Sequence, residues 1–254
     1  MHKKLIPALL LAAGLGLAGA AQAAISWDFT CSSNCNPSWT PGNTRTYGGS
    51  GVGSPSVTAS AWANTGGSTN TLIQDAYLSA WSGGLGVRNR DYVSGDTGET
   101  SSPQHSMDNY RRYDSVLFSF SDAVKLTDVK IGWRQNDSDI TVLAWGGSGA
   151  PTPAGATYGG LVAAGWNLIG HYSNLVVNTP RSINAGNYSS SYWLIGAYIP
   201  LVGSPTGWGS SDYVKLATLY GEKTHQTPEP GVAALLALGL LALSLSRRRV
   251  PVKK

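Results

Sequence analysis

Short apolar segments with the period of a β-strand recur along residues 24–227, separated by runs of Gly, Ser, Asn and Pro. Within residues 113–120, Val116, Phe118 and Phe120 alternate with polar positions, which predicts a strand with one buried face. The pattern changes phase after Leu126, which predicts a turn or bulge near Thr127 and Asp128. The remaining strands are expected within residues 25–29, 56–63, 72–81, 124–133, 140–145, 166–172, 192–199 and 213–220.

Strands that follow one another without intervening helices predict antiparallel pairing. We therefore predict an all-β chain with a single antiparallel β-sandwich or jelly-roll-like ectodomain over residues 24–221. A signal helix and a transmembrane helix are expected to flank it at the N-terminal and C-terminal sides. Residues 41–56 and 146–160 are rich in Gly and are expected to be surface loops inside this domain, with a hairpin turn near Asn136 and Asp137.

The composition supports this class. Charged residues make up 13% of the 254 residues, against about 25% in a typical chain. Gly occurs 32 times and Pro 13 times, and the chain has 9 Trp and 12 Tyr. Few charges and many turn and ring residues exclude a coiled coil, a helical bundle and an acidic disordered tail.

Residues 1–23 have the three parts of a secretory signal peptide. Lys3 and Lys4 form a basic start, an apolar run covers residues 5–18, and Ala21 and Ala23 frame a small-x-small cleavage site. Cleavage is expected between Ala23 and Ala24. The chain is therefore expected to leave the cytoplasm through a secretion translocase.

A second apolar run covers residues 231–246 and predicts a transmembrane helix of about 24 Å, slightly shorter than a hydrocarbon core of roughly 30 Å. The basic residues 247–254 follow it and are expected to stay cytoplasmic. Residues 222–230 precede it as a stalk that ends in Pro228, Glu229 and Pro230, where two prolines favour an extended segment.

Pro-Glu-Pro, a short apolar helix and the cluster Arg247, Arg248 and Arg249 stand in this order, which resembles the PEP-CTERM sorting signal of Gram-negative bacteria. The resemblance covers the C-terminal segment only, and Thr227 occupies a position where Val is frequent in the family. It implies that an exosortase, a membrane-embedded protease-like enzyme, processes the tail near Pro-Glu-Pro.

Four segments in the middle of the chain, residues 81–87, 103–109, 131–133 and 137–142, resemble a family of exosortase-dependent surface proteins. This resemblance implies a surface or matrix protein and transfers no catalytic residue.

Together these features predict a non-enzymatic exported protein of the cell surface or of the extracellular (biofilm) matrix, anchored transiently in the inner membrane. Without the signal lysines and the tail, which carries five cations and Glu229, the net charge falls from +4 to near −2. No basic patch remains to hold a nucleic acid. The alternative functions are a lectin-like carbohydrate-binding module and, less favoured, an exopolysaccharide hydrolase.

No sequence motif for nucleophilic, phosphate-binding or zinc-dependent catalysis occurs. The ectodomain contains only His105 and His171 as histidines, and only Glu99 and Glu222 as glutamates. A hydrolase would need a facing pair of carboxylates, and no motif indicates one. Cys31 and Cys35 are expected to form a disulfide after export, because a metal site would need further ligands nearby.

Two binding sites are conceivable. Asp108, Asn109, Asp137 and Asp139 carry the oxygen ligands that Ca²⁺ prefers. The alternatives are that they only form turns, or that Arg111, Arg112 and Arg134 neutralise them in surface ion pairs. The exposed rings of Trp39, Trp62 and Trp208, or of the segment Tyr188, Tyr192 and Trp193, would offer a stacking platform for exopolysaccharide, and the alternative is that they fill the core.

Overall fold

The computed structural model describes residues 24–32, 35, 40–91, 103, 105–203, 208–209, 211–224, 236 and 239–240. The expected signal peptide, the Pro-Glu-Pro motif, the Arg cluster, nearly all of the expected transmembrane helix and Trp39 lie outside these residues. Within the described residues, no helix is long and apolar enough to cross a membrane.

The described part of the chain is all-β, as predicted, with a single large antiparallel sheet and one short 3-10 helix. The elements are β1 (Ile25–Asp28), β2 (Thr44–Tyr47), β3 (Val57–Gly66), β4 (Leu72–Asp75), β5 (Tyr77–Trp81), β6 (Gly84–Arg88), β7 (Met107–Asp108), β8 (Asp114–Asn136), β9 (Ile140–Trp145), η1 (Tyr158–Gly160), β10 (Trp166–Tyr172), β11 (Arg181–Ser182), β12 (Ser190–Ala197) and β13 (Asp212–Lys223).

Strand β8 organises the sheet. Its residues 114–120 lie between β3 and β12, whereas its residues 124–136 pair with β13. The two separate strands predicted over 113–120 and 124–133 are therefore one continuous strand that changes partners. The predicted bulge is confirmed: Asp128 pairs with Tyr220 and Leu126 with Gly221, so that Thr127 has no partner in the register.

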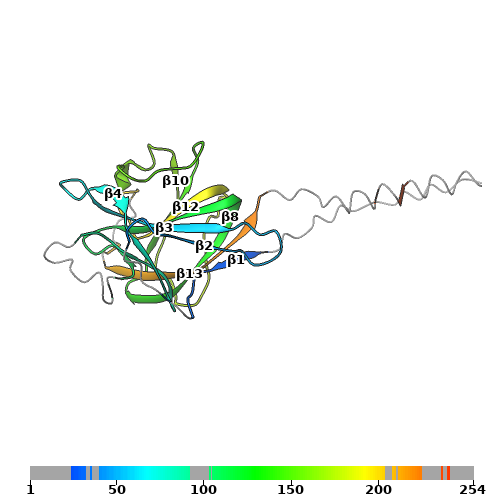
Figure 1. Ribbon diagram of the computed structural model, residues 1–254, viewed down its shortest axis with the longest axis horizontal. Coiled ribbons are helices and arrows are strands. Elements are labelled where there is room, and N and C mark those ends of the chain that lie inside the picture. Colours follow the sequence, from blue (N-terminus) through cyan, green and yellow to red (C-terminus); the bar gives the residue numbers. More distant parts are fainter. Residues whose placement is uncertain are drawn as a thin grey trace, which may run out of the picture.

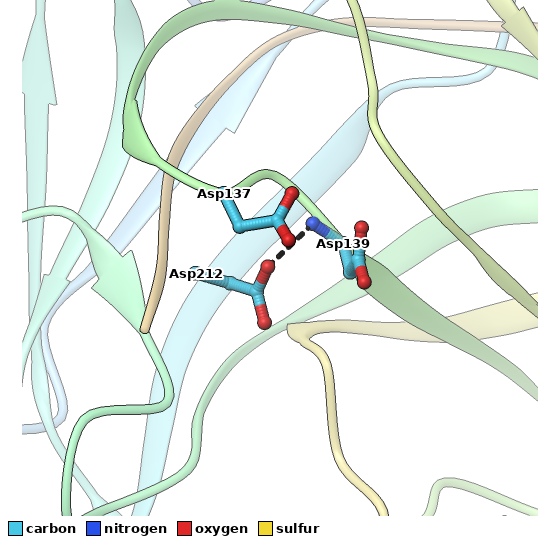
Figure 2. Close-up of side chains that lie close together, drawn as sticks. All are labelled: Asp137, Asp139 and Asp212. Atoms are coloured by element: carbon cyan, nitrogen blue, oxygen red, sulfur yellow. Dashed lines mark hydrogen bonds between the residues drawn. The ribbon is translucent and has the colours of Figure 1, made fainter. Parts of the chain in front are cut away.

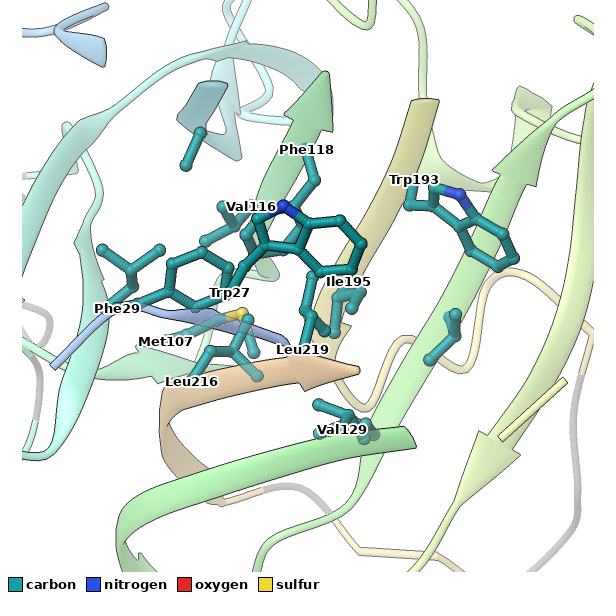
Figure 3. Packing of buried hydrophobic residues seen from close by; sticks show 14 of the residues in the cluster. Trp27, Phe29, Met107, Val116, Phe118, Val129, Trp193, Ile195, Leu216 and Leu219 are labelled. Atoms are coloured by element: carbon teal, nitrogen blue, oxygen red, sulfur yellow. The ribbon is translucent and has the colours of Figure 1, made fainter. Parts of the chain in front are cut away.

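One core joins the two parts of the sheet. Phe118 of β8 and Trp193 of β12 meet Leu219 of β13 and Trp27 of β1 in a single buried cluster (Figure 3). Figure 1 shows β1 beside β13, and Ile25 is paired with Gly221. Residues near the two ends of the domain are thus adjacent strand partners.

The second face of the strand over residues 113–120 is also covered, which differs from the half-buried strand predicted. Leu117 packs with Tyr158 and Leu161 in a second buried cluster, and the Ser115 hydroxyl lies 2.8 Å from the Tyr158 hydroxyl. The Gly-rich residues 146–160 were predicted to be a surface loop. Most of this segment is exposed, as predicted, but η1 lies within it and buries Tyr158 against the sheet, because the aromatic ring supplies enough apolar area to hold it there.

Two further predictions were wrong in detail. Strand β2 lies inside the expected loop 41–56 and pairs with β3. The expected hairpin near Asn136 does not form, since β9 pairs with β10 and β12 and never with β8. The chain does turn near Asn136, but this turn connects β8 to β9, which are not neighbouring strands of the sheet.

The predicted disulfide between Cys31 and Cys35 is confirmed, with 5.5 Å between the Cα atoms. Cys31 packs against the edge of the main core, directly after β1. The bond therefore constrains only a short loop beside the first strand.

Candidate cation site

Three aspartates converge where β8 ends and β13 begins. Asp137 follows β8, Asp139 precedes β9, and Asp212 is the first residue of β13. Each offers a carboxylate oxygen, and these oxygens lie within 4.8 Å of one another. Figure 2 shows the carboxylates of Asp137 and Asp212 close together, with Asp139 beside them.

Backbone amides orient the three carboxylates. Asp212 Oδ1 accepts from the amide of Asp139 at 2.7 Å, which is the dashed contact in Figure 2. Asp139 Oδ1 accepts from the amide of Asn174 at 2.7 Å, and Asp137 Oδ1 accepts from the amide of Ser138 at 2.8 Å. The last bond is local turn chemistry of the kind predicted as one alternative. The other two connect segments far apart in sequence.

Asn109 supports this cluster. Its side-chain oxygen accepts from the amides of Ser211 and Asp212, each at 2.8 Å, and its Nδ2 donates to Asp212 Oδ2 at 2.6 Å. The predicted ligand oxygen of Asn109 is therefore already bonded to two amides. This residue holds Asp212 in place and does not point its oxygen at the cluster.

Asp108, the other residue predicted on this segment, is not among the converging carboxylates. It lies in β7 opposite Tyr213, and its Oδ1 accepts from the amide of Tyr110 at 2.9 Å. The third converging carboxylate is that of Asp212, not that of Asp108.

Burial makes this cluster electrostatically costly. Asp139 and Asp212 are buried and Asp137 is partly buried. Burial, with Asp139 and Asp137 nearby, raises the pKa of Asp212 to about 7, although hydrogen bonds from Asp139 and Asn109 oppose the rise. Burial and the neighbouring Asp137 also raise the pKa of Asp139. The protein thus disfavours three negative charges here in the absence of a cation.

Arg112 and Arg134 do not neutralise the three converging aspartates. Arg112 pairs with Asp91, and Arg134 donates to the carbonyl of Asn136. No ion pair of the described residues includes Asp137, Asp139 or Asp212. Among the described residues, surface ion pairs are not observed at Asp137, Asp139 or Asp212, whereas turn chemistry is observed for both Asp137 and Asp108.

Three carboxylates have the chemistry for a hard divalent cation. Ca²⁺ takes six to eight oxygen ligands, so that water would complete a shell begun by Asp137, Asp139 and Asp212. Sequence reasoning missed Asp212 because it lies 73 positions after Asp139. Only the pairing of β13 with the end of β8, Asp212 opposite Asn136, brings it to the site.

Of the tryptophans proposed for an aromatic platform, Trp39 lies outside the described residues, and Trp62 and Trp208 do not lie together. Trp62 is partly buried against the second core cluster, and its Nε1 donates to Ser60. Trp208 lies 5.1 Å from the ring of Tyr198 and 6.1 Å from that of His171, both measured between ring centroids. The two indoles therefore have separate surroundings.

Comparison with known proteins adds no relative. No protein-family model matches the chain, and neither a curated protein nor a solved structure matches it.

Proposed function

We propose that this chain is a non-enzymatic, exported protein of a Gram-negative cell surface or extracellular matrix. A secretion translocase exports it, and an exosortase processes its tail. The observation that carries the proposal is the order of parts along the sequence: a signal peptide, one β domain, Pro-Glu-Pro, an apolar run and an Arg cluster. Between processing steps the protein is held in the inner membrane by residues 231–246.

The architecture of the β domain suits this order. Strand β1 begins at Ile25, directly after the expected cleavage site, and β13 ends at Lys223, two residues into the expected stalk. Because β1 and β13 are paired, both connections leave from neighbouring strands. Removing residues 1–23 would therefore leave the core whole, and a C-terminal anchor would not have to pass through the domain. We also propose that the strands form a sandwich or jelly roll, with a signal helix before the domain and a transmembrane helix after it.

Ca²⁺ binding is the second candidate function, favoured by the convergence of Asp137, Asp139 and Asp212. A cation at this point would tie the end of β8 to the starts of β9 and β13. It would act as a structural ligand of the surface domain and supply no catalysis.

Intact-mass measurement of the protein recovered from producing cells tests the main proposal. The expected mature chain begins at Ala24 and lacks Arg247 to Lys254. Replacing Pro228, Glu229 and Pro230 together by alanines should retain the tail, whereas Gln226→Ala serves as the neighbouring control and should be processed normally. Recovery of most wild-type molecules with the Arg cluster still attached would contradict the proposal.

A further inference from the structure

An open groove of about 470 Å³ lies over the far end of β9. Its walls are formed by the glycine-rich residues after Trp145, by the segment that leads into β12, and by Phe120 and Ser121 of β8. The volume falls in the range of roughly 300–1,000 Å³ that is typical of small-molecule sites. The acidic cluster lies at the other end of β9, six strand residues or about 20 Å away.

Four aromatic side chains line this groove: Phe120 is buried, whereas Trp145, Tyr188 and Tyr192 are only partly buried. Hydroxyl groups of serines and backbone groups of exposed glycines stand between them. Among the residues that the structure describes, no charged side chain lines the groove. Such a wall offers neutral hydrogen-bonding groups beside partly buried aromatic rings, without the charge needed to hold an ionic ligand.

Hydrogen bonds hold Tyr188 and Trp145 in place. The Tyr188 hydroxyl accepts from Asn167 Nδ2 at 2.7 Å, while the Asn184 side chain bonds both the amide and the carbonyl of Tyr188 at 2.8 Å. Trp145 Nε1 donates to the carbonyl of Gly149 at 2.9 Å. These bonds fix the side chains before any ligand arrives, which lowers the entropy cost of binding.

Ser190 and Gly146 also line the groove. The hydroxyl of Ser190 lies 2.8 Å from the carbonyl of Trp145 and accepts from the amide of Tyr192 at 3.0 Å. A Cβ on Gly146 would lie 2.3 Å from Asn167 Nδ2 and 2.6 Å from the Tyr188 hydroxyl. Glycine at this position therefore allows the bond between Asn167 and Tyr188 to form across the groove wall.

We propose that this groove binds a neutral glycan. The C–H face of a sugar ring stacks on an exposed aromatic ring, and its hydroxyls bond to the serine and backbone groups between the rings. The absence of charged lining groups favours neutral sugars over uronic acids or phosphorylated sugars. Because the groove is open, it suits a unit within a longer polysaccharide. The proposal goes beyond export and sorting, since the site lies wholly within the described β domain.

Affinity electrophoresis of the full chain tests this, in native gels containing dextran, β-glucan, xylan or galactomannan. Alginate serves as the acidic polymer, and the detergent must carry no sugar headgroup, which would compete for the groove. We expect retardation by at least one neutral polymer and none by alginate. EDTA should not change the retardation, because the acidic cluster is at the other end of β9. Failure with every neutral polymer, equal retardation by alginate, or loss of retardation in EDTA would each overturn the proposal.

Two variants locate the site. Tyr192→Ala should weaken binding about tenfold, with Tyr220→Ala as a control at a partly buried tyrosine of β13. Ser189 is exposed, so that Ser189→Trp should fold normally and abolish retardation by filling the groove, with Ser68→Trp as its control in an exposed turn. Binding that persists unchanged in both Tyr192→Ala and Ser189→Trp would show that glycan is held elsewhere and would overturn the assignment.

Discussion

Lys215 Nζ lies 2.9 Å from Nε2 of His105 and also faces the rings of Trp81 and Trp133, at 4.9 and 4.8 Å from their centroids. Lys215 is buried in the middle of β13. The two indole faces favour its ammonium form, because the ring quadrupole attracts a cation. Lys215 thereby joins three segments that are far apart in the sequence, residues 81–87, 103–109 and 131–133.

The lowered pKa of Lys215 predicts that the folded protein becomes more stable as the pH rises. Burial lowers the pKa of Lys215 to about 8 from 10.5, so that the unfolded chain binds more protons between these values. The free energy of unfolding should therefore rise by about 2 kcal/mol from pH 7.5 to pH 9.5. Urea titrations at several pH values measure it. Lys215→Met should remove this rise, whereas Lys130→Met should keep it; an equal rise in all three proteins would contradict the assignment.

The raised pKa of Asp212 predicts that the folded protein becomes less stable as the pH rises through a lower range. Its pKa is raised from 3.8 to about 7, so that the folded chain binds more protons than the unfolded chain between these values. In the presence of a chelator, the free energy of unfolding should fall by about 3 kcal/mol as the pH rises from 5 to 8. Asp212→Asn should flatten most of this fall, and Asp122→Asn, at the surface, should not. A wild-type curve without the fall would show that Asp212 is ionised at little cost.

Ca²⁺ should stabilise the domain if the three aspartates hold it. At a hundredfold excess over its dissociation constant, Ca²⁺ adds about 2.7 kcal/mol to the free energy of unfolding. Calorimetric melts with Ca²⁺ and with a chelator measure the gain. The double variant Asp137→Ala, Asp139→Ala should lose the gain, and Asp122→Ala should keep it. Identical melting temperatures with Ca²⁺ and chelator would identify the cluster as a hydrogen-bonded network without a cation.

Gly86 should not tolerate a side chain. A Cβ at this position would lie 2.2 Å from the carbonyl oxygen of His105, which is part of the backbone and cannot rotate away. Gly86→Ala should therefore lower the free energy of unfolding by about 2 kcal/mol or more. Gly48→Ala is the matched control, because nothing lies within 4 Å of its Cβ. Similar urea midpoints for the two variants would argue against close contact between β6 and the residues around His105.

Local features were predictable because they depend on a few neighbouring residues. Alternation of period two placed Val116, Phe118 and Phe120 on one buried face, and a break in that alternation located the bulge at Thr127. The disulfide followed from the presence of two cysteines in an exported chain. These inferences need no knowledge of which strands are neighbours.

The sites depend on strand pairing across long sequence distances. Asp212 reaches Asp137 and Asp139 because β13 pairs along β8, and Lys215 reaches Trp133 through the same pairing. Alternation shows which face of a strand is apolar but not which strand lies beside it. A buried polar contact such as that between Asp212 and the amide of Asp139 arises only after hydrophobic burial has brought distant strands together, so that no local pattern of residues encodes it.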